Sequence, residues 1–413
     1  MRLPSEAIAN IVNAVGPLAE TESVPIAEAL GRVLGGDVVS DIDLPPFEKS
    51  AMDGFAVRSA DFGPSEPGSP PVRLRVLGES RAGEPFGGAI AAGECTAIYT
   101  GAELPQGSDA VVMVEKSSEE APEEGGGTPR IVQLDDRPGP GQHVCHRGED
   151  LAAGATVLRA GRRLSAVDLS VLSAVGCEPV PVARRPRVVL CTTGDELVTP
   201  DRRPGPGEIR EGSTPMLAAA LGRLGAEVEN LGILPDDPAE LTRTFGAALE
   251  RCDLFLTTGG VSMGRYDLVG GVLEELGVRP VFHKVAIKPG KPIWFGMRGR
   301  VPVFGLPGNP VSSLVGLAVF VQPALAVLEG ADPGPLEPLE RAVWQGNERR
   351  AIVRQQNIPA RLVAQPDGRL ALEPVRWKGS ADVVGLAEAD ALAVVPPEAG
   401  LAPGDVVAYR RLR

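Results

Sequence analysis

The sequence predicts a multidomain protein of α/β plus β class. A central three-layer α/β/α domain with a mostly parallel sheet is flanked by an N-terminal mixed and β region and by a small, barrel-like C-terminal β domain. The 413 residues suit two to four domains of roughly 150 residues each. Gly and Pro number 51 and 40, below the level of low-complexity disorder, so they indicate tight turns between short elements. Between residues 187 and 328 strands alternate with helices, which is typical of a parallel sheet covered by helices.

The N-terminal half combines helical and β-rich segments. Residues 4–35 are predicted to be helical, because SEAIANIVNAV carries apolar residues at helical spacing. The segments VRLRVLG, CTAIYTG and DAVVMVE lie between Gly and Pro turns and predict a small β domain. A further helix is predicted over Ser165–Val175, with Ser165 as its N-cap.

The central region repeats a strand, a loop and a helix. The pairs are RVVLCTTGDE with TPMLAAALGRLG, EVENLGILPDDP with PAELTRTFGAALE, and DLFLTTGGVSMGRYD with LVGGVLEELG. The strands VFHKVAIK and VPVFGLPGNP follow, and the second leads into the helix PVSSLVGLAVF. After Glu329 the segments RLALEPVRW, ADALAVVPP and DVVAYRRL predict β structure again. The predicted domains are residues 1–48 together with 142–182, then 49–141, 183–328 and 329–413.

Composition restricts the class of protein. A formal charge of −13 argues against nucleic acid as a partner, since nucleic-acid binders need basic surfaces. Five cysteines without a C-x-x-C motif fit thiols in a reducing cytosol. The longest apolar segment, Leu314–Leu328, is interrupted by Gln322 and Pro323 and is predicted to be too short to span a bilayer. We therefore expect a cytoplasmic protein without a membrane partner.

Polar residues follow several of the predicted parallel strands. In open α/β sheets, ligands bind where the carboxyl ends of the strands meet the following loops. Each loop alone is compatible with ordinary turn chemistry, but four at one edge favour a site. Asn309 also precedes Pro310, a typical first helical residue, so its helix start predicts an anion site. The loop residues are Asp195, Glu196, Asp236, Asp237, Ser262, Asp267, Gly308 and Asn309.

Three lysines lie beside these loops, in HKVAIKPGKP. If residues 284–288 are extended, Lys284 and Lys288 share a face, and the Pro289-Gly290 turn brings Lys291 round. Three ammonium groups in eight residues favour anion binding over a solvated edge strand. Carboxylates, lysines and a helix start together suit a phosphate ester with bound Mg²⁺.

A literal G-x-S-x-G runs from Gly260 to Gly264, the pattern of a serine-hydrolase nucleophile elbow. A hydrolase of that kind needs a later histidine, and His283 lies only 21 positions after Ser262. Ser262 is therefore expected to donate a hydrogen bond at most, while the glycines let the backbone turn closely around a ligand.

Several motifs together resemble one family over residues 4–410: DLPPFEKSAMDGFAV, YTGAELPQGSDAVVMVE, RGEDLAAGA, TTGDEL, LPDDP, TGGVSMGRYD, KVAIKPGKP and GLPGNPVSS. The chain resembles the MoeA and gephyrin E-domain family of molybdopterin molybdotransferases. The resemblance implies an elongated homodimer whose cleft is completed by the β domain of the other subunit. It also implies Mg²⁺-dependent hydrolysis of adenylylated molybdopterin with insertion of molybdenum from molybdate, which yields AMP and molybdenum cofactor.

The same resemblance assigns roles to residues of this chain. It implies catalytic roles for Asp53, Asp150, Glu196, Asp236, Asp267, Lys284 and Lys288. Asp236 and Asp267 are the predicted metal ligands. Molybdate contacts are expected from Lys288, Lys291 and Ser312. Substrate contacts are expected from Thr100, Gly259, Gly260, Ser262, Lys291, Gly308, Asn309, Ser312, Arg354 and Ser380.

The chain departs from the family pattern at three places, one of which is MDGF, residues 52–55, in place of the commoner MDGY. Cys145-His146 replaces consecutive arginines before RGED, and residues 211–214, Glu-Gly-Ser-Thr, replace an Asp-Ser-Asn-like run. The departure at residues 211–214 leaves ligand contacts at that helix start open. Two alternative functions also stay open, a molybdopterin adenylyltransferase and a non-catalytic scaffold of the same architecture. An adenylyltransferase and molybdoenzyme-maturation proteins are the expected protein partners.

Overall fold

The computed structural model describes residues 1–64, 69–120, 130–260, 268–334 and 340–412. Contacts divide the chain into two compact units. One comprises Met1–Gly36, Ala160–Ala166 and Pro179–Arg413, and the other comprises Asp37–Arg159 and Val167–Glu178. We describe each unit by itself. The four predicted domain ranges remain a prediction.

The first unit contains a six-stranded sheet in the order β16-β13-β17-β21-β20-β18. Its first three pairings are parallel, as predicted, and β20 runs antiparallel to both of its neighbours. The sequence analysis did not identify β20. The bounds are β13 Arg187–Thr193, β16 Glu227–Leu234, β17 Leu254–Thr258, β18 Arg279–His283, β20 Trp294–Arg298 and β21 Val301–Leu306.

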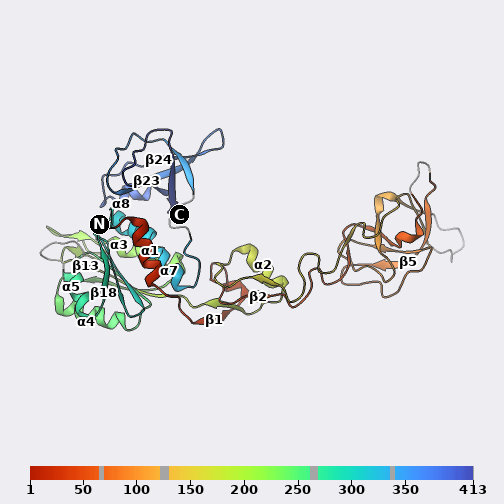
Figure 1. Cartoon of the computed structure of the whole chain (residues 1–413), viewed down its shortest axis with the longest axis horizontal. Helices are drawn as coiled ribbons and strands as arrows, with labels where there is room; N and C mark the ends of the chain where they lie inside the picture. The colour runs from red at the N-terminus through yellow and green to blue at the C-terminus, as the bar shows by residue number, and fades with distance from the viewer. Residues whose placement is uncertain (65–68, 121–129, 261–267, 335–339, 413) are drawn as a thin grey trace. The chain divides into compact units, whose positions relative to one another are not determined.

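Helices cover both faces of this sheet, which confirms the three-layer prediction (Figure 1). Alternating residues of a strand point to opposite faces. Val188 and Leu190 therefore join one core, with α1, α3 and α7, while Val189 and Cys191 join the other, with α4 and α5. The helices are α1 Pro4–Ala14, α3 Ser213–Arg223, α4 Pro238–Leu249, α5 Leu268–Glu275, α6 Pro310–Gly316 and α7 Gln322–Leu328.

The helical segment Pro310–Leu328 is continuous through Gln322 and Pro323, so the prediction that this apolar segment is too short to span a bilayer is wrong. A π-helical segment, η4 (Leu317–Val321), joins α6 to α7 and precedes the proline. Proline cannot donate the regular helical hydrogen bond, and a local π turn accommodates that loss. Among the described residues this is the one helix long and apolar enough to cross a membrane, but 78% of it is buried within the protein. It is therefore a core helix.

The C-terminal part of the first unit is a closed barrel. Strand pairings run β23-β24-β22-β26-β25 and return to β23, around Trp344 and Tyr409. The short β19 (Ile287–Lys288), which comes from the central part of the chain, pairs with β23 in this sheet. The bounds are β22 Arg341–Trp344, β23 Gln355–Ala364, β24 Leu370–Pro374, α8 Val383–Ala387, β25 Ala391–Val395 and β26 Val406–Arg411.

The prediction of helix over residues 4–35 is wrong after Ala14. The chain passes Gly16-Pro17 and forms β1 (Thr21–Val24), which pairs antiparallel with β12 (Val180–Ala183), and then the short 3₁₀ turn η1 (Ile26–Glu28). Pro17 ends the helix because the residue before a proline is disfavoured in helical conformation. The residues after Ala14 whose apolar spacing suggested a longer helix lie instead in and around the two-stranded β1–β12 ribbon.

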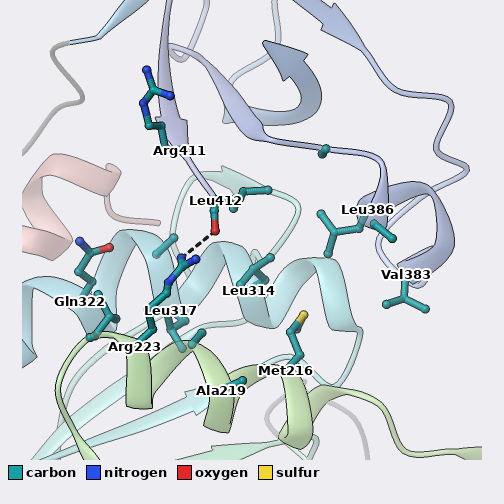
Figure 2. Close-up of a pocket in the computed structure, with 15 residues that line it drawn as sticks. Met216, Ala219, Arg223, Leu314, Leu317, Gln322, Val383, Leu386, Arg411 and Leu412 are labelled. Carbon is teal, nitrogen blue, oxygen red and sulfur yellow. Dashed lines mark hydrogen bonds between the residues drawn. The ribbon is translucent and has the colours of Figure 1, made fainter.

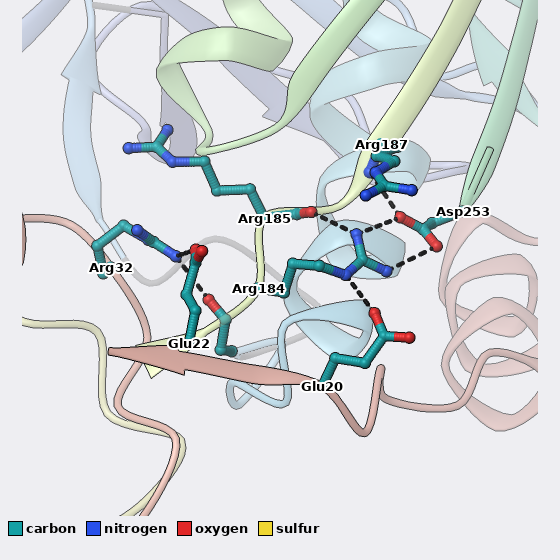
Figure 3. Close-up of polar contacts among 8 residues, drawn as sticks. Glu20, Glu22, Arg32, Arg184, Arg185, Arg187 and Asp253 are labelled. Carbon is teal, nitrogen blue, oxygen red and sulfur yellow. Dashed lines mark hydrogen bonds and ion pairs between the residues drawn. The ribbon is translucent and has the colours of Figure 1, made fainter. Parts of the chain in front are cut away.

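Arg184 joins this ribbon to the central sheet (Figure 3). Its guanidinium donates to both oxygens of Asp253 at 2.8 and 3.0 Å and also pairs with Glu20. Asp253 Oδ2 accepts a further bond from the Arg187 N–H at 2.7 Å. The Arg184 and Asp253 side chains are 19% and 17% exposed. Charge-assisted, two-point contacts of this kind are among the stronger polar interactions.

Replacing Asp253 with Ala is expected to destabilise the first unit by about 2 kcal/mol, because it leaves a half-buried guanidinium and a backbone N–H without their acceptor. The melting temperature should fall by about 4–8 °C. Glu229→Ala is the matched control, since it breaks the Arg251 pair, whose side chains are 43% and 49% exposed. Such exposed pairs contribute about 0.2–1 kcal/mol. Equal shifts for the two variants would contradict the prediction.

The second unit is built mainly on a sheet in the order β7-β4-β6-β5-β9-β8. Two short ribbons, β2 with β11 and β3 with β10, and the helix α2 complete it. The bounds are β2 Val38–Val39, β3 Lys49–Ser50, β4 Gly54–Val57, β5 Val72–Ser80, β6 Glu94–Ile98, β7 Ala110–Met113, β8 Ser117–Glu119, β9 Ile131–Leu134, β10 Val144–Cys145, β11 Thr156–Leu158 and α2 Ala166–Ala174.

Candidate functional site

A pocket of about 650 Å³ lies at the carboxyl edge of the central parallel strands. The ends of β13, β17 and β21 and the starts of α3 and α6 surround it, which is the place that open α/β sheets use for ligands. Six predicted site residues meet in or beside it: Glu196, Asp236, Gly259, Gly260, Gly308 and Asn309. Two more predicted residues, Ser262 and Asp267, lie outside the described residues.

Two glycines let the chain turn closely at the floor of the pocket. Gly259 has φ +82° and Gly260 has φ +59°. A Cβ on Gly259 would lie 2.4 Å from the Thr193 carbonyl oxygen, and one on Gly260 would lie 2.6 Å from Val269. A side chain at either position would collide with the neighbouring strand or helix, and the left-handed backbone disfavours it further. The two glycines therefore allow β17 to end directly against β13.

Carboxylates gather on one side of the pocket. Asp236 lies two residues after the end of β16, and its N–H donates to Asp195 Oδ1 at 3.1 Å. Partial burial raises the pKa of Asp236, and the negative charges of Asp195 and Glu196 raise it further. Oxygen donors that repel one another favour a bound cation, which removes the repulsion.

These residues suit a hard cation such as Mg²⁺ in chemical type. Carboxylate oxygens are its preferred protein ligands, and Mg²⁺ commonly takes one or two of them together with substrate oxygens. The described residues contain no group of three or more His, Cys, Asp or Glu placed to hold a metal ion. Among the described residues, Asp236 and its acidic neighbours Asp195 and Glu196 are therefore the oxygen donors that fit such a cation in chemical type, and a metal site here stays a prediction.

The start of α6 is capped by the C-terminal part of the chain, so the prediction of free N–H groups there is wrong in part. The Val311 N–H donates to the Ser380 carbonyl oxygen at 3.0 Å. The Asn309 amide donates to the Ser380 hydroxyl at 3.1 Å. Ser380 therefore lies beside the pocket, as a capping partner of the Asn309 loop. Ser312, one turn into α6, is 4% exposed.

The three lysines lie on a hairpin, and the expectation that residues 284–288 are extended is wrong. Lys284 has φ +75° and ends β18, so it does not share a strand face with Lys288. The Lys284 N–H donates to the Ile293 carbonyl, and the Val285 N–H donates to the Lys291 carbonyl, both at 3.0 Å. Lys288 and Lys291 are exposed, whereas Lys284 is half-buried.

The hairpin packs against α6 and beside the barrel. A Cβ on Gly290 would lie 3.5 Å from the Ser312 carbonyl oxygen, so the Lys288–Lys291 turn contacts the first turn of that helix. Arg354 directly precedes Gln355, whose N–H donates to the Ala286 carbonyl at 2.8 Å. The structure therefore connects the lysine turn by backbone contacts both to α6, which carries Ser312, and to the strand that follows Arg354, while none of these four residues lines the carboxylate pocket.

The remaining predicted residues belong to the second unit. The Thr100 N–H and hydroxyl both donate to Asp53 Oδ1 at 2.7 Å. The backbone N–H and then the hydroxyl of Thr100 lower the pKa of Asp53. Asp150 is exposed, and its N–H donates to the Leu44 carbonyl at 2.9 Å. Asp53 and Thr100 thus form a preorganised pair with an ionised carboxylate.

Sequence reasoning did not identify Glu211 and Ser213 as site residues, although both line the pocket. Glu211 is 8% exposed and Ser213 is 3% exposed. The signal was the Ser-Thr-Pro run at residues 213–215, a typical helix start that follows an acidic residue.

A second, mostly apolar cavity of about 450 Å³ shares Val383 with the pocket in its lining (Figure 2). Met216 and Ala219 of α3 line it together with Leu314 and Leu317, and Leu386 of α8 closes it. The Arg223 side chain donates to the Leu412 carbonyl at 2.7 Å. The cavity separates the barrel from α3, and its lining is that of a packing gap between two parts of one unit.

Comparisons with known proteins agree along the chain. Residues 3–176 match the MoeA N-terminal region (domain I and II), residues 189–327 match a probable molybdopterin binding domain, and residues 342–412 match the MoeA C-terminal region (domain IV). A protein of Synechococcus elongatus named molybdopterin molybdenumtransferase is 38% identical over 96% of this chain and 95% of its own. One of the same name from Haemophilus influenzae is 36% identical over 87% and 86%.

The chain is also similar to a solved structure over nearly its full length. The molybdopterin biosynthesis MoeA protein from Pyrococcus horikoshii is 29% identical, covers 99% of both chains and has a TM-score of 0.83. The order of the three matched regions, the full-length relatives and the pocket at the sheet edge lead to one conclusion. The chain belongs to the MoeA family.

Proposed function

We propose that the protein inserts molybdenum from molybdate into adenylylated molybdopterin and releases molybdenum cofactor and AMP. Its family membership supports molybdenum transfer to molybdopterin as the reaction. The observation that carries the finer proposal is the pocket itself, where a glycine turn for close ligand approach and a carboxylate group lie at one edge. The lysine hairpin lies next to it. This arrangement suits a substrate that carries both a phosphate anhydride and an oxyanion.

We assign the adenylate to the carboxylate side of the pocket. Gly259 and Gly260 present backbone to the ligand without side chains in the way. Asp236, with Asp267 as its proposed companion, would hold Mg²⁺, which when bound supplies Lewis acidity to the phosphate oxygens. Glu196 lines the same wall and orients the nucleotide. Closing such a site to water strengthens each of these electrostatic contacts.

We assign molybdate to the lysine hairpin. Molybdate is a dianion, and Lys288 and Lys291, both exposed, lie on either side of the Pro289-Gly290 turn, whose Gly290 approaches the backbone of Ser312 in α6. Positive charges fixed at the end of a turn attract such an anion without reorganising. Arg354, at the start of β23, adds a guanidinium to the same neighbourhood.

Replacing Lys288 with Ala should raise the molybdate concentration for half-maximal turnover by about tenfold, which corresponds to loss of one charge-assisted contact. Binding of adenylylated molybdopterin should change little. Cofactor formation measured against molybdate concentration checks this. Lys116→Ala is the matched control, an exposed lysine of the second unit. An unchanged molybdate dependence in Lys288→Ala would remove this lysine from the assignment.

One incubation tests the overall proposal against its two rivals. Purified protein is mixed with adenylylated molybdopterin, molybdate and Mg²⁺, while AMP release and cofactor formation are followed. Both products are expected, and they should depend on molybdate. ATP-dependent loading of AMP onto molybdopterin would instead identify an adenylyltransferase. Absence of any turnover would favour a scaffold.

We further propose a cytoplasmic homodimer in which the Asp53–Thr100 pair and Asp150 of one subunit complete the pocket of the other. The preorganised carboxylate of Asp53 supports a role in binding rather than in folding alone, because it lies at the surface. An adenylyltransferase would supply the substrate, and molybdoenzyme-maturation proteins would take the product. Sedimentation velocity tests the dimer, and a monomer at working concentration would contradict it.

A further inference from the structure

The carboxylate of Glu211 already occupies the start of α3. Its Oε1 accepts the backbone N–H groups of Ser213 and Thr214 at 2.6 and 2.8 Å, and its Oε2 accepts the Thr214 hydroxyl at 2.8 Å. The N-cap residue is Gly212, which has no side chain to cap the helix. The glutamate therefore satisfies N–H groups that a helix start otherwise leaves open, and its charge complements the helix dipole.

This capped helix start faces the pocket. Glu211, Gly212 and Ser213 all line it, as do Gly259 and Gly260. A helix start that faces a pocket commonly binds the phosphate of a ligand. Here the chain's own carboxylate, 8% exposed, holds that position. A substrate phosphate that entered the same cradle would meet a fixed negative charge and no free N–H group from Ser213 or Thr214.

Ser213 connects the start of α3, which Glu211 caps, to the Gly308 loop of the pocket. Its hydroxyl donates to the Gly308 carbonyl at 3.0 Å. Gly308 in turn lies against Gly259, because a Cβ on Gly308 would be 3.5 Å from the Gly259 Cα. The position of α3 thus sets the position of the Gly308–Asn309 loop, which borders the pocket and contacts Ser380.

We propose that Glu211 is a positioning residue of this site: it excludes a substrate phosphate from the start of α3 and, through Ser213, fixes the Gly308 loop against the glycine turn. The inference rests on the proposed function for its kinetic consequence. It assigns the phosphate of the adenylate to the Gly259–Gly260 side of the pocket.

The kinetic test uses the full-length protein with Glu211→Ala, Glu211→Gln and a control. Glu211→Ala should raise KM for adenylylated molybdopterin about tenfold, the effect of losing one well-placed charged hydrogen-bonding group, with a smaller change in kcat. Glu211→Gln keeps an oxygen acceptor and should stay within about threefold of the wild type. The control is Glu6→Ala, since Glu6 is exposed and likewise accepts a backbone N–H, that of Leu3, at the start of a helix, α1. It should alter stability and leave KM unchanged.

Chemical rescue separates positioning from a general loss of stability. Formate fits the space of the missing carboxylate, so added formate should lower KM of Glu211→Ala in a saturable manner and should not affect Glu6→Ala. A folded Glu211→Ala protein with raised KM and no response to formate would overturn the proposal. So would a wild-type KM without formate.

A binding experiment needs no turnover. Titration with inorganic phosphate, followed by calorimetry, should reveal a site in Glu211→Ala that formate competes for and that the wild type lacks. Identical phosphate binding by both proteins would overturn the exclusion. If the wild type released no AMP, the proposed function would fail, while this titration would still decide the role of Glu211.

Ser213→Ala covers the case in which Glu211→Ala does not fold. It removes the bond to the Gly308 carbonyl and keeps the cap, because Glu211 binds the backbone N–H of residue 213. KM should rise about threefold or more, with no response to formate and an unchanged melting temperature. An unchanged KM would show that the Gly308 loop does not depend on α3.

Discussion

Replacing Gly259 with Ala is expected to abolish molybdenum insertion and to destabilise the first unit by about 3 kcal/mol or more. The added Cβ would lie 2.4 Å from the Thr193 carbonyl oxygen, in a backbone conformation with φ +82°. The Thr193 backbone cannot move away easily, because Thr193 ends the central strand β13 and is only 3% exposed. The Gly259–Gly260 turn would have to move away from the edge of β13. Because this turn forms the floor of the pocket, the shape of the pocket would change as well.

Thermal unfolding and AMP release measure the two effects separately. The melting temperature should fall by about 6–12 °C. Gly271→Ala is the matched control, since this glycine lies in α5 and a Cβ there meets nothing within 4 Å. Alanine in an exposed helical position should stabilise the protein by about 0.5–1 kcal/mol and leave activity intact. A stable, active Gly259→Ala variant would contradict the close packing of β17 on β13.

Replacing Asp236 with Asn should slow AMP release by about a hundredfold or more, because it removes the carboxylate proposed to hold the cation at the phosphate. The matched control is Asp237→Asn. Asp237 caps α4 by accepting the Glu240 N–H at 2.7 Å, and it does not line the pocket. Asparagine caps helices about as well as aspartate, so this neighbouring change should leave both stability and activity near those of the wild type.

Stability should move in the opposite direction to activity in Asp236→Asn. Burial and the charges of Asp195 and Glu196 raise the pKa of Asp236 above its ordinary value. A carboxyl group with a raised pKa in the folded state stabilises the protein at acid pH, and this contribution is lost as pH rises through that pKa. The variant should therefore melt above the wild type at neutral pH without metal, and the gain should disappear in acid. A lower melting temperature at neutral pH would contradict this.

Local patterns made the central layers predictable. The strand RVVLCTT alternates its side chains between two cores, and helices such as PAELTRTFGAALE carry a clear apolar face. The carboxyl-edge residues follow from that topology, since parallel strands end at one edge. Asp236, Gly259 and Asn309 therefore meet in the structure as neighbours of one pocket. Their chemical roles stay proposals.

The features that sequence reasoning missed depend on contacts between distant segments. The hydrogen bond from the Val311 N–H to the Ser380 carbonyl joins residues that are far apart in the chain. The local sequence at the start of α6 therefore could not predict that Ser380 caps this helix. The strand β20 was missed because Pro292 and Gly296 suggest a loop, although its side chains pack against β21. Lys284 adopts a left-handed conformation that ordinary lysines avoid, and no local signal announces it.

The pairing of β19 with β23 makes the lysine hairpin a mechanical part of the barrel. Ile287 and Lys288 are aligned with Gln355 and Gln356, so the hairpin tip is hydrogen-bonded to the barrel while its base continues β18 and β20 of the central sheet. Any tilt of the barrel would pull on the tip and leave the base in place. Lys288 is therefore fixed at both ends by backbone pairing, and its position relative to Ser312 depends on the barrel as well as on the central sheet.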